Sequence, residues 1–235
     1  MNCNIAKSPI APLSSVTDAA DEAAPTQAFC AAPLMERNYW NTRYQTKTFI
    51  WTQTANQFLL SEVTELPPGR VLDLAAGEGR NAIWLAEQGW DVHAVDFSEV
   101  AIDKGRQLAE QRQVSERIRF EVEDLRSYQP EEHGFDLIVM MYLQLPQAEL
   151  APIIARAVQA VAPGGTFLLV GHDSENLTHG VGGPRHPAML YTAGQVANLI
   201  GNTLQIQQAR QVTRQVTTED GPRLALDCLV RGQRI

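Results

Sequence analysis

Apolar and polar positions divide most of the chain into two kinds of segment. Five runs are almost continuously apolar, among them "FDLIVMM" and "GTFLLVG". Such runs are typical of strands in a sheet that is covered on both faces. The segments between them are expected to be helices, with Ser98 and Pro146 as two of the starting residues. Strands are expected at 71–75, 91–96, 118–123, 135–141 and 165–171, and helices at 79–88, 98–113 and 146–161.

The pattern changes near the end of the chain. "LQIQQARQVTRQV" and "RLALDCLVRG" alternate with period two and flank "TTEDGP", which is a turn signal. These segments predict a closing antiparallel hairpin. Cys228 alternates there with Leu224, Leu226 and Val230, so it is expected to pack in the core. The whole pattern predicts an α/β fold: a doubly wound, seven-stranded, mostly parallel sheet of the Rossmann-like kind.

The part of the chain that precedes the sheet has two sections. Residues 1–34 are rich in Ala, Pro, Ser and Thr, too poor in large apolar groups to offset the entropy of ordering, and are expected to form a disordered tail. A single domain is expected over 35–235, and Met35 could be the native start. The following aromatic segments are expected to be helical or partly helical. They could dock on an apolar face or cover a ligand; their aromatic residues are Tyr39, Trp40, Tyr44 and Trp51.

Composition narrows the function classes. Of 235 residues, 44% are hydrophobic, and the net charge is -8. This acidic balance argues against nucleic acid as a partner, since phosphate binding needs clustered Lys and Arg. We find no apolar run long enough to span a membrane and no signal peptide. Three scattered cysteines indicate neither a disulfide framework nor a metal site. The expected compartment is the cytoplasm.

Candidate chemistry lies at the ends of the first two strands. Asp73 interrupts one apolar run and Asp96 closes the next, with a glycine turn between them. A buried carboxylate is costly unless something binds it. The segment from Gly77 to Ala82 matches the dinucleotide pattern G-x-G-x-x-G/A, but Asp73 and Glu78 would flank a pyrophosphate with negative charge. A cofactor carrying an ammonium and a sulfonium turns that carboxylate into an asset, which favours S-adenosylmethionine over NAD.

Four motifs together carry a family resemblance. They are "VLDLAAGEGRN", "VDFS", "EDL" and "FDLIVMMY", and the closing hairpin agrees with them. The chain from about residue 36 resembles the class I S-adenosylmethionine-dependent methyltransferases. Within them it is most similar to the small-molecule branch that contains the tellurite-resistance and thiopurine methyltransferases. One departure is Ala75, which stands where that branch usually has glycine.

The resemblance implies roles for individual residues. Asp73 and Gly77 would hold the turn and the methionine moiety, and Asp96 would bind the ribose. Phe97 would pack on adenine and Ser98 would cap the next helix. Asp124 would accept from the adenine amino group, and Leu125 would offer its backbone N–H. The remaining residues expected at the cofactor site are Trp40, Ala75, Arg80 and Asn81 and, on its floor, Met140 and Met141.

The acceptor side is expected where the fifth strand ends. His172 and Asp173 leave that strand beside the expected methyl group and are the candidate catalytic residues. The long loop from 172 to 191 adds His179, Arg185 and His186. A thiol or a chalcogen oxyanion would need no general base, whereas a hydroxyl or an amine would need one, with His172 as first candidate. A non-catalytic S-adenosylmethionine-binding module and an NAD-dependent oxidoreductase remain as alternative functions.

Overall fold

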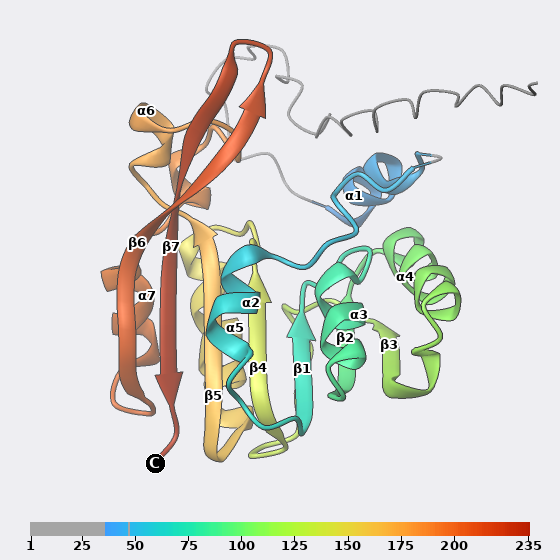
Figure 1. The fold of residues 1–235 in the computed structure, drawn as a ribbon. Coiled ribbons are helices and arrows are strands. Elements are labelled where there is room, and N and C mark those ends of the chain that lie inside the picture. The colour runs from blue at the N-terminus through green and yellow to red at the C-terminus, as the bar shows by residue number, and fades with distance from the viewer. Residues whose placement is uncertain (1–35, 47) are drawn as a thin grey trace, which may run out of the picture.

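The computed structural model describes residues 36–46 and 48–235. The predicted tail over 1–34 and the boundary at Met35 lie outside the described residues. The described chain forms one sheet in the order β3-β2-β1-β4-β5-β7-β6 (Figure 1). The strands are β1 Arg70–Leu74, β2 Asp91–Asp96, β3 Ile118–Val122, β4 Phe135–Met141, β5 Val161–His172, β6 Gln205–Thr218 and β7 Gly221–Gln233.

The first five strands are parallel to one another, and β7 runs antiparallel to both β5 and β6. This arrangement confirms the expected seven-stranded, mostly parallel, doubly wound sheet. Each of the five expected parallel strands is present within about one residue, except that β5 begins at Val161 rather than 165. The closing hairpin is also present, and its turn is shorter than expected, because Thr218 already pairs with Gly221.

Helices cover both faces of the sheet. On one face α5 and α7 pack on an apolar cluster that includes Leu74, Phe167 and Val230. On the other face α2, α3 and α4 pack on a second cluster that includes Val71 and Leu229. The bounds are α1 Arg37–Tyr44, α2 Gln57–Val63, α3 Arg80–Glu87, α4 Glu99–Gln111, α5 Gln147–Ala160, α6 Asn176–His179 and α7 Ala193–Ile200, with 3-10 turns η1 Ser115–Arg117 and η2 Pro187–Met189.

Two parts of the chain differ from the expected pattern. The loop from 172 to 191 contains α6 and η2, and α7 follows it as a helix that the apolar pattern did not predict. The sequence signal for α7 is a capping box, in which Thr192 and Gln195 bond each other's backbone N–H groups. Of the expected aromatic helices, α1 is present, whereas most of the second segment is irregular until α2 begins at Gln57.

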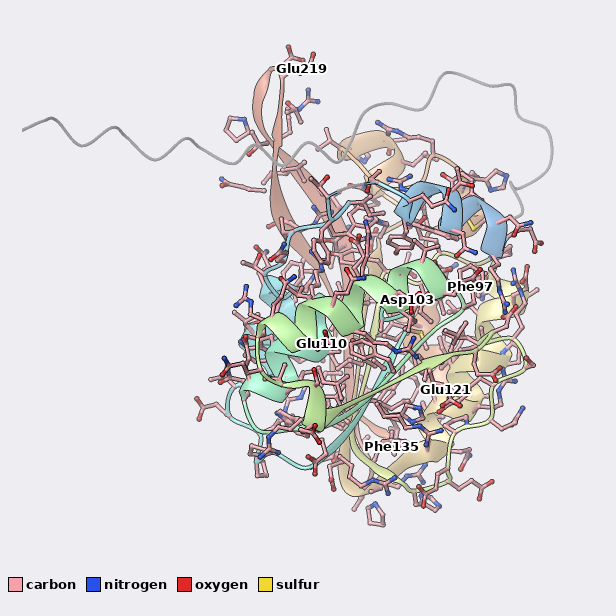
Figure 2. All side chains as sticks on the ribbon, turned by 90° about the vertical axis from the view of Figure 1, so that its right-hand side faces the viewer. Phe97, Asp103, Glu110, Glu121, Phe135 and Glu219 are labelled. Carbon is pink, nitrogen blue, oxygen red and sulfur yellow. The ribbon has the colours of Figure 1, made fainter. Side chains whose placement is uncertain are left out.

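The β6–β7 hairpin extends past the rest of the sheet. Residues 213–218 pair only with 221–226, whereas β5 pairs with the 227–233 part of β7. Figure 1 shows this extension rising above the end of the sheet where α1 lies, and Figure 2 shows Glu219 at its tip. In the part of the chain that the structure describes, no helix has the length and apolar character to cross a membrane.

Candidate active site

The candidate site residues gather at one edge of the sheet. The strand order reverses between β1 and β4, and ligands of open α/β sheets bind at such a switch point, beyond the carboxyl ends of the strands. In Figure 1 the arrowheads of β1 and β4 point to the end of the sheet where α1 lies. Figure 2 shows Phe97 at this end, below α1, and Phe135 at the opposite end.

Asp73 is the least satisfied polar group at this edge. Its side chain is fully buried, and among the described residues the backbone N–H of Ala82 comes near its carboxylate but is not aligned as a full hydrogen bond. Burial first, and then the neighbouring Asp96, raise the pKa of this carboxyl group to about 7; Arg80 and the backbone N–H of Ala82 oppose the rise. A buried carboxylate without well-aligned donors is costly, so a cationic ligand group is what this position can accommodate.

Asp96 is buried as well, but it has donors. Its two oxygens accept from the backbone N–H groups of Gly77 and Ser98, each at 2.9 Å. Burial raises the pKa of Asp96 to about 6, and these bonds together with one from Phe97 counter part of the rise. The Ser98 hydroxyl accepts from the N–H of Ala101 at 3.2 Å and caps α4, as the sequence predicted. Asp96 therefore ties the glycine turn to the start of α4.

The turn after β1 needs residues with positive φ. Gly77 and Gly79 have φ of 55° and 79°, and Ala75 has φ of 61°. The left-handed region is strained for alanine but open to glycine. A Cβ on Gly77 would lie 2.9 Å from the hydroxyl oxygen of Tyr44. The absence of a side chain on Gly77 therefore lets the Tyr44 hydroxyl lie close over the turn.

Helix α1 is docked over this turn. Its Asn41 accepts from the Ser98 hydroxyl at 2.7 Å and donates to Glu99 at 2.8 Å. The Trp40 ring stacks on Tyr44 with centroids 5.7 Å apart. Arg43 lies 5.6 Å from the Trp40 ring centroid and 5.4 Å from that of Trp51. The aromatic segment therefore docks against the body of the protein, as one expectation had it, and it lies over the glycine turn; that it covers a ligand stays a prediction.

One part of the electrostatic reasoning from the sequence was wrong. Glu78 does not present its charge to the turn. Its carboxylate accepts from Lys104 at 2.9 Å and from the backbone N–H groups of Ile50 and Trp51. The charge of Glu78 is compensated within the protein, so the preference for a cationic ligand depends on Asp73.

The other expected cofactor residues lie around the same edge. Asn81 accepts from the backbone N–H of Asn56 at 2.9 Å, and Arg80 donates to Thr52 at 3.1 Å. Asp124 accepts from the N–H of Arg126 and pairs with its guanidinium at 3.3 Å. Leu125 is buried in the cluster under α5 and α7. Met140 belongs to that cluster and Met141 to the one on the other face, because successive strand residues point to opposite faces.

A second polar cluster occupies the carboxyl ends of β4 and β5, and we call it the Asp227 cluster. Its members are Tyr142, His172, Arg214 and Asp227. Asp227 is fully buried on β7, directly across from His172 on β5. It accepts from the Tyr142 hydroxyl at 2.8 Å and from Arg214 Nε at 3.1 Å. His172 Nδ1 lies 3.2 Å from its other oxygen, near but not aligned as a hydrogen bond.

Charges within the Asp227 cluster compensate one another. Burial alone would raise the pKa of Asp227, but His172, Arg214 and Tyr142 together hold it below its usual value. Burial, followed by the charge of Asp227, raises the pKa of the Tyr142 phenol. The Tyr142 ring lies 4.7 Å from the His172 ring. Tyr142 also has a φ of 57°, and such backbone outliers are concentrated at functional sites.

The structure separates His172 from Asp173. The Asp173 carboxylate accepts from the N–H of Glu175 and from Gln211 Nε2, at 3.0 and 3.1 Å, on the far side of the strand. His172 instead faces Tyr142, and Gly183 covers its ring so closely that a Cβ there would lie 2.9 Å from it. His179 and His186 bond within their own loop, to Thr178 and to the N–H of Ala188.

The loop over His172 is anchored. Asn176, which is buried, accepts from the N–H of Leu226 at 2.7 Å and donates to the carbonyl of Gly182 at 2.9 Å. The N–H of Val181 also donates to the Leu224 carbonyl of β7. The glycines of this loop therefore lie against a fixed polar framework. Arg185 donates to the carbonyl of Leu177 within the same loop.

Comparison with known proteins identifies the domain. Residues 71–165 match the family model described as a methyltransferase domain. The chain therefore contains a methyltransferase domain, and its fold is one that S-adenosylmethionine-dependent methyltransferases share. This domain agrees with the family expected from the motifs and with S-adenosylmethionine as the cofactor. The matched segment contains the glycine turn, both carboxylates Asp73 and Asp96, and the strands β1 to β4.

Several curated proteins resemble part of this chain. The tRNA 5-carboxymethoxyuridine methyltransferase of Escherichia coli K12 is 30% identical over 144 residues, which are 59% of this chain and 53% of that protein. The chain spans about half the length of the curated relatives it matches.

Two solved structures share the fold. TehB from Haemophilus influenzae has a TM-score of 0.66 at 20% identity and covers 85% of this chain and 67% of its own. A SAM-dependent methyltransferase from Methanosarcina mazei has a TM-score of 0.61 at 18% identity, over 77% of this chain and 99% of its own. At these identities the likeness establishes the fold alone.

The residues at this edge fit S-adenosylmethionine. Its ammonium would offer Asp73 a cationic partner beyond the partial compensation by Arg80, and the glycine turn keeps side chains away from the backbone at Gly77. Among the described residues, no group of three or more His, Cys, Asp or Glu side chains could hold a metal ion. Sequence reasoning missed Tyr142, Arg214 and Asp227. Asp227 gave no separate signal, because it falls at an alternate position of "RLALDCLVRG", where a polar residue agrees with period two.

Proposed function

We propose that the protein transfers a methyl group from S-adenosylmethionine to an acceptor bound above the carboxyl ends of β4 and β5. The observation that carries this proposal is Asp73, a fully buried carboxylate whose oxygens have no well-aligned hydrogen bond from a described residue, at the start of the glycine turn. When bound there, S-adenosylmethionine supplies an electrophilic methyl group. The protein has to align this group with the acceptor and exclude water.

In this proposal, different residues bind different parts of the cofactor. Asp73 and Gly77 hold the methionine moiety. Asp96 still has lone pairs that its backbone hydrogen bonds do not use, and these accept hydrogen bonds from the ribose hydroxyls. Phe97, Asp124 and the N–H of Leu125 bind adenine. Supporting positions are Trp40, Ala75, Arg80, Asn81, Met140 and Met141.

We further propose that the acceptor is a small molecule. The relative from Escherichia coli is named as a tRNA methyltransferase, which makes tRNA the second candidate. The net charge of -8 and the pairing of exposed arginines with acidic residues, as in Arg106–Asp103 and Arg117–Asp91, speak against a broad phosphate-binding surface. The anchored loop also lies close over His172, where a Cβ on Gly183 would be 2.9 Å from the ring, which favours a small acceptor.

Cofactor binding is tested first. Thermal unfolding is followed with S-adenosylmethionine, S-adenosylhomocysteine and NAD, each in excess. A ligand present at about 100 times its Kd stabilises the folded state by about 2.7 kcal/mol, which is readily seen as a higher Tm. We expect both sulfur compounds to raise the Tm and NAD to leave it unchanged. Stabilisation by NAD alone would refute the proposal.

The ribose assignment has a matched control on the same strand. Asp96 closes β2 at the site, whereas Asp91 opens β2 at the other end of the sheet, with a side chain 72% exposed. Asp96→Asn preserves the size of the side chain but loses one acceptor oxygen. We expect at least about a tenfold loss of affinity for S-adenosylhomocysteine, since bonds to charged groups contribute about 1.5–3 kcal/mol. Asp91→Asn should bind as the wild type does, and equal affinity in both variants would exclude Asp96.

The acceptor class is tested by transfer of a labelled methyl group. The wild-type protein is supplied with thiols, chalcogen oxyanions, phenols, amines and unmodified bulk tRNA in parallel reactions. We expect product in at least one small-molecule reaction and none with tRNA. Methylated tRNA without any small-molecule product would replace the small-molecule proposal with the second candidate.

A further inference from the structure

The Asp227 cluster has no part in holding the cofactor. Its members come from four places in the sequence: Tyr142 directly follows β4, His172 ends β5, Arg214 lies on β6 and Asp227 on β7. A buried ion pair such as Arg214–Asp227 is a weak source of stability, because the cost of removing both charges from water offsets their attraction. An apolar pair of similar volume would serve the fold as well. The arrangement therefore calls for a chemical reason.

The orientation of His172 supplies that reason. Its Nδ1 is enclosed and faces Asp227 Oδ1 at 3.2 Å, so Nε2 is the ring nitrogen left to meet a ligand. Tyr142 and Arg214 hold the other oxygen of the same carboxylate at 2.8 and 3.1 Å, which fixes the carboxylate in turn. A carboxylate that faces one imidazole nitrogen sets the tautomer and stabilises the imidazolium that forms when the other nitrogen takes a proton.

Polar contacts link the Asp227 cluster to the glycine turn. Asn81, the second residue of α3, accepts from the N–H of Asn56, and the side chain of Asn56 in turn reaches the Tyr142 phenol. Tyr142 lies between this contact and the His172 ring. A chain of polar contacts thus runs from the end of the glycine turn to His172. An acceptor above His172 would lie beside the place that the proposed function gives to the methyl group.

We propose that the acceptor is a group that must lose a proton, a hydroxyl or an amine, and that Asp227 positions His172 as the base that removes it. This inference rests on the proposed function. In the reaction, the acceptor proton passes to Nε2 of His172 as the acceptor lone pair forms the bond to the methyl carbon. The electrons of the broken C–S bond stay on sulfur as S-adenosylhomocysteine leaves, and His172 later gives its proton to water.

The same geometry argues against the acceptors that need no base. A thiol is partly ionised near neutral pH, with a usual pKa of about 8.5, whereas a phenol at about 10 is not. A chalcogen oxyanion would be bound best by an uncompensated cation. The guanidinium of this cluster, Arg214, is committed to Asp227 and lies over the Tyr142 ring at 5.6 Å from its centroid.

The test compares two acceptors that differ only in ionisation. One is a phenol that is protonated at the assay pH, and the other is a nitrophenol of similar size that is already ionised. The proteins are the wild type, His172→Ala, Asp227→Asn and the distant control Asp91→Asn. General bases contribute about 10²- to 10⁴-fold. We therefore expect His172→Ala to lower kcat by about 100-fold or more with the protonated phenol, and by less than about tenfold with the ionised one.

Asp227 is tested as a positioning residue. Asp227→Asn should lower kcat for the protonated phenol by about tenfold or more, while affinity for S-adenosylhomocysteine stays within about threefold, less than a lost hydrogen bond would cause. If Asp227→Asn unfolds, the double variant Asp227→Leu with Arg214→Met removes the ion pair as a whole. Such replacements are often neutral or stabilising. We expect the double variant to fold and to show the same acceptor-dependent loss.

Each outcome separates the two proposals. If the variants lose the same factor with both phenols, His172 is not a base and the inference fails. If the wild type methylates only thiols or chalcogen oxyanions, the inference also fails, while the proposed methyl transfer stands. If the wild type binds no S-adenosylhomocysteine, the proposed function itself fails.

Discussion

Asp73 and Asp227 are both fully buried carboxylates at the same edge of one sheet, yet their surroundings are opposite. Asp73 on β1 accepts no well-aligned hydrogen bond from a described residue, and burial raises its pKa to about 7. Asp227 on β7 is faced by an arginine, a tyrosine and a histidine, which hold its pKa below the usual value despite burial. Arg80 offsets only part of the cost of burying the first carboxylate, which leaves room for a cation from a ligand, whereas the second is already held by its own arginine.

The difference shows how burial of one residue type can serve two purposes. An uncompensated carboxylate makes the ligand-free protein less stable and makes binding of a cation more favourable, because the ligand relieves the cost of burial. A compensated carboxylate binds little that is new, but it fixes the orientation of the groups around it. We assign binding to Asp73 and positioning to Asp227 on this basis.

Removing Asp227 alone should have the largest effect on stability. Asp227→Ala leaves Arg214, whose side chain is 27% exposed, without its partner and Tyr142 without its acceptor. Breaking a fully buried pair costs about 3–5 kcal/mol, so a loss toward the lower end of that range is expected here. Urea denaturation should show this loss, whereas Asp91→Ala, at an exposed position, should stay within about 0.5 kcal/mol of the wild type. A loss below about 1 kcal/mol would mean that the pair is not buried as described.

Removing the charge of Asp73 should stabilise the ligand-free protein, which is the opposite of the effect expected at Asp227. Asp73→Asn removes a charge that has no well-aligned donor, so the ligand-free protein should become more stable at about pH 8, by about 1–3 kcal/mol. The same variant should lose at least about tenfold in affinity for S-adenosylhomocysteine, since the ammonium of the ligand loses its counter-charge. Urea denaturation and calorimetric titration measure the two effects. A less stable variant would contradict the incomplete compensation of Asp73.

The pH dependence of stability sharpens the contrast further. A carboxyl group whose folded pKa is raised stays protonated in the folded protein while the unfolded chain ionises. Folding is then progressively destabilised as pH rises from the usual value of 3.8 to about 7 for Asp73 and to about 6 for Asp96. The ligand-free wild type should therefore lose stability between about pH 4 and about pH 7, and Asp73→Asn should lose less, by on the order of 2–4 kcal/mol. Parallel curves for the two proteins would exclude the raised pKa of Asp73.

The smallest expected effect concerns the turn that follows Asp73. Ala75 has a φ of 61°, a conformation that glycine adopts without strain. Ala75→Gly should stabilise the protein by up to about 1 kcal/mol, since the relief of strain exceeds the extra entropy of the unfolded glycine. Gly77→Ala is the matched reverse change and should be destabilising. Destabilisation by Ala75→Gly would show that packing of the Ala75 methyl group stabilises the protein by more than the backbone strain at this residue destabilises it.

The sequence was sufficient for the parallel part of the fold because burial on both faces leaves a direct pattern. Apolar runs such as Phe135–Met141 have no polar face and are bounded by turn residues, so β1 to β5 could be located. Helix α7 was missed because it is only eight residues long and follows a segment rich in Gly and Pro. Its capping residues, Thr192 and Gln195, predict the start of a helix only when they are recognised together as a capping box.

The site was predictable where ligand-binding residues lie close together in sequence. Asp73 and Asp96 lie on neighbouring strands of one βαβ unit, so a motif includes both. The Asp227 cluster combines Tyr142 and His172 with residues on β6 and β7, and its closest contact, Tyr142 to Asp227, spans 85 positions. Only the pairing of β5 with β7 brings His172 and Asp227 together. No local pattern contains that register.

The two indoles beside the glycine turn give the protein an optical signal of its own. Trp40 and Trp51 flank the guanidinium of Arg43 at the end of the sheet where the cofactor is proposed to bind, whereas Trp90 is buried in the core under α2 and α3. Emission from these two half-buried rings depends on their contact with water and with the charge between them. Ligand binding at the turn can thus be followed by fluorescence of the unlabelled chain, with Trp84 and Trp90 at the second apolar cluster as the background that the ligand does not reach.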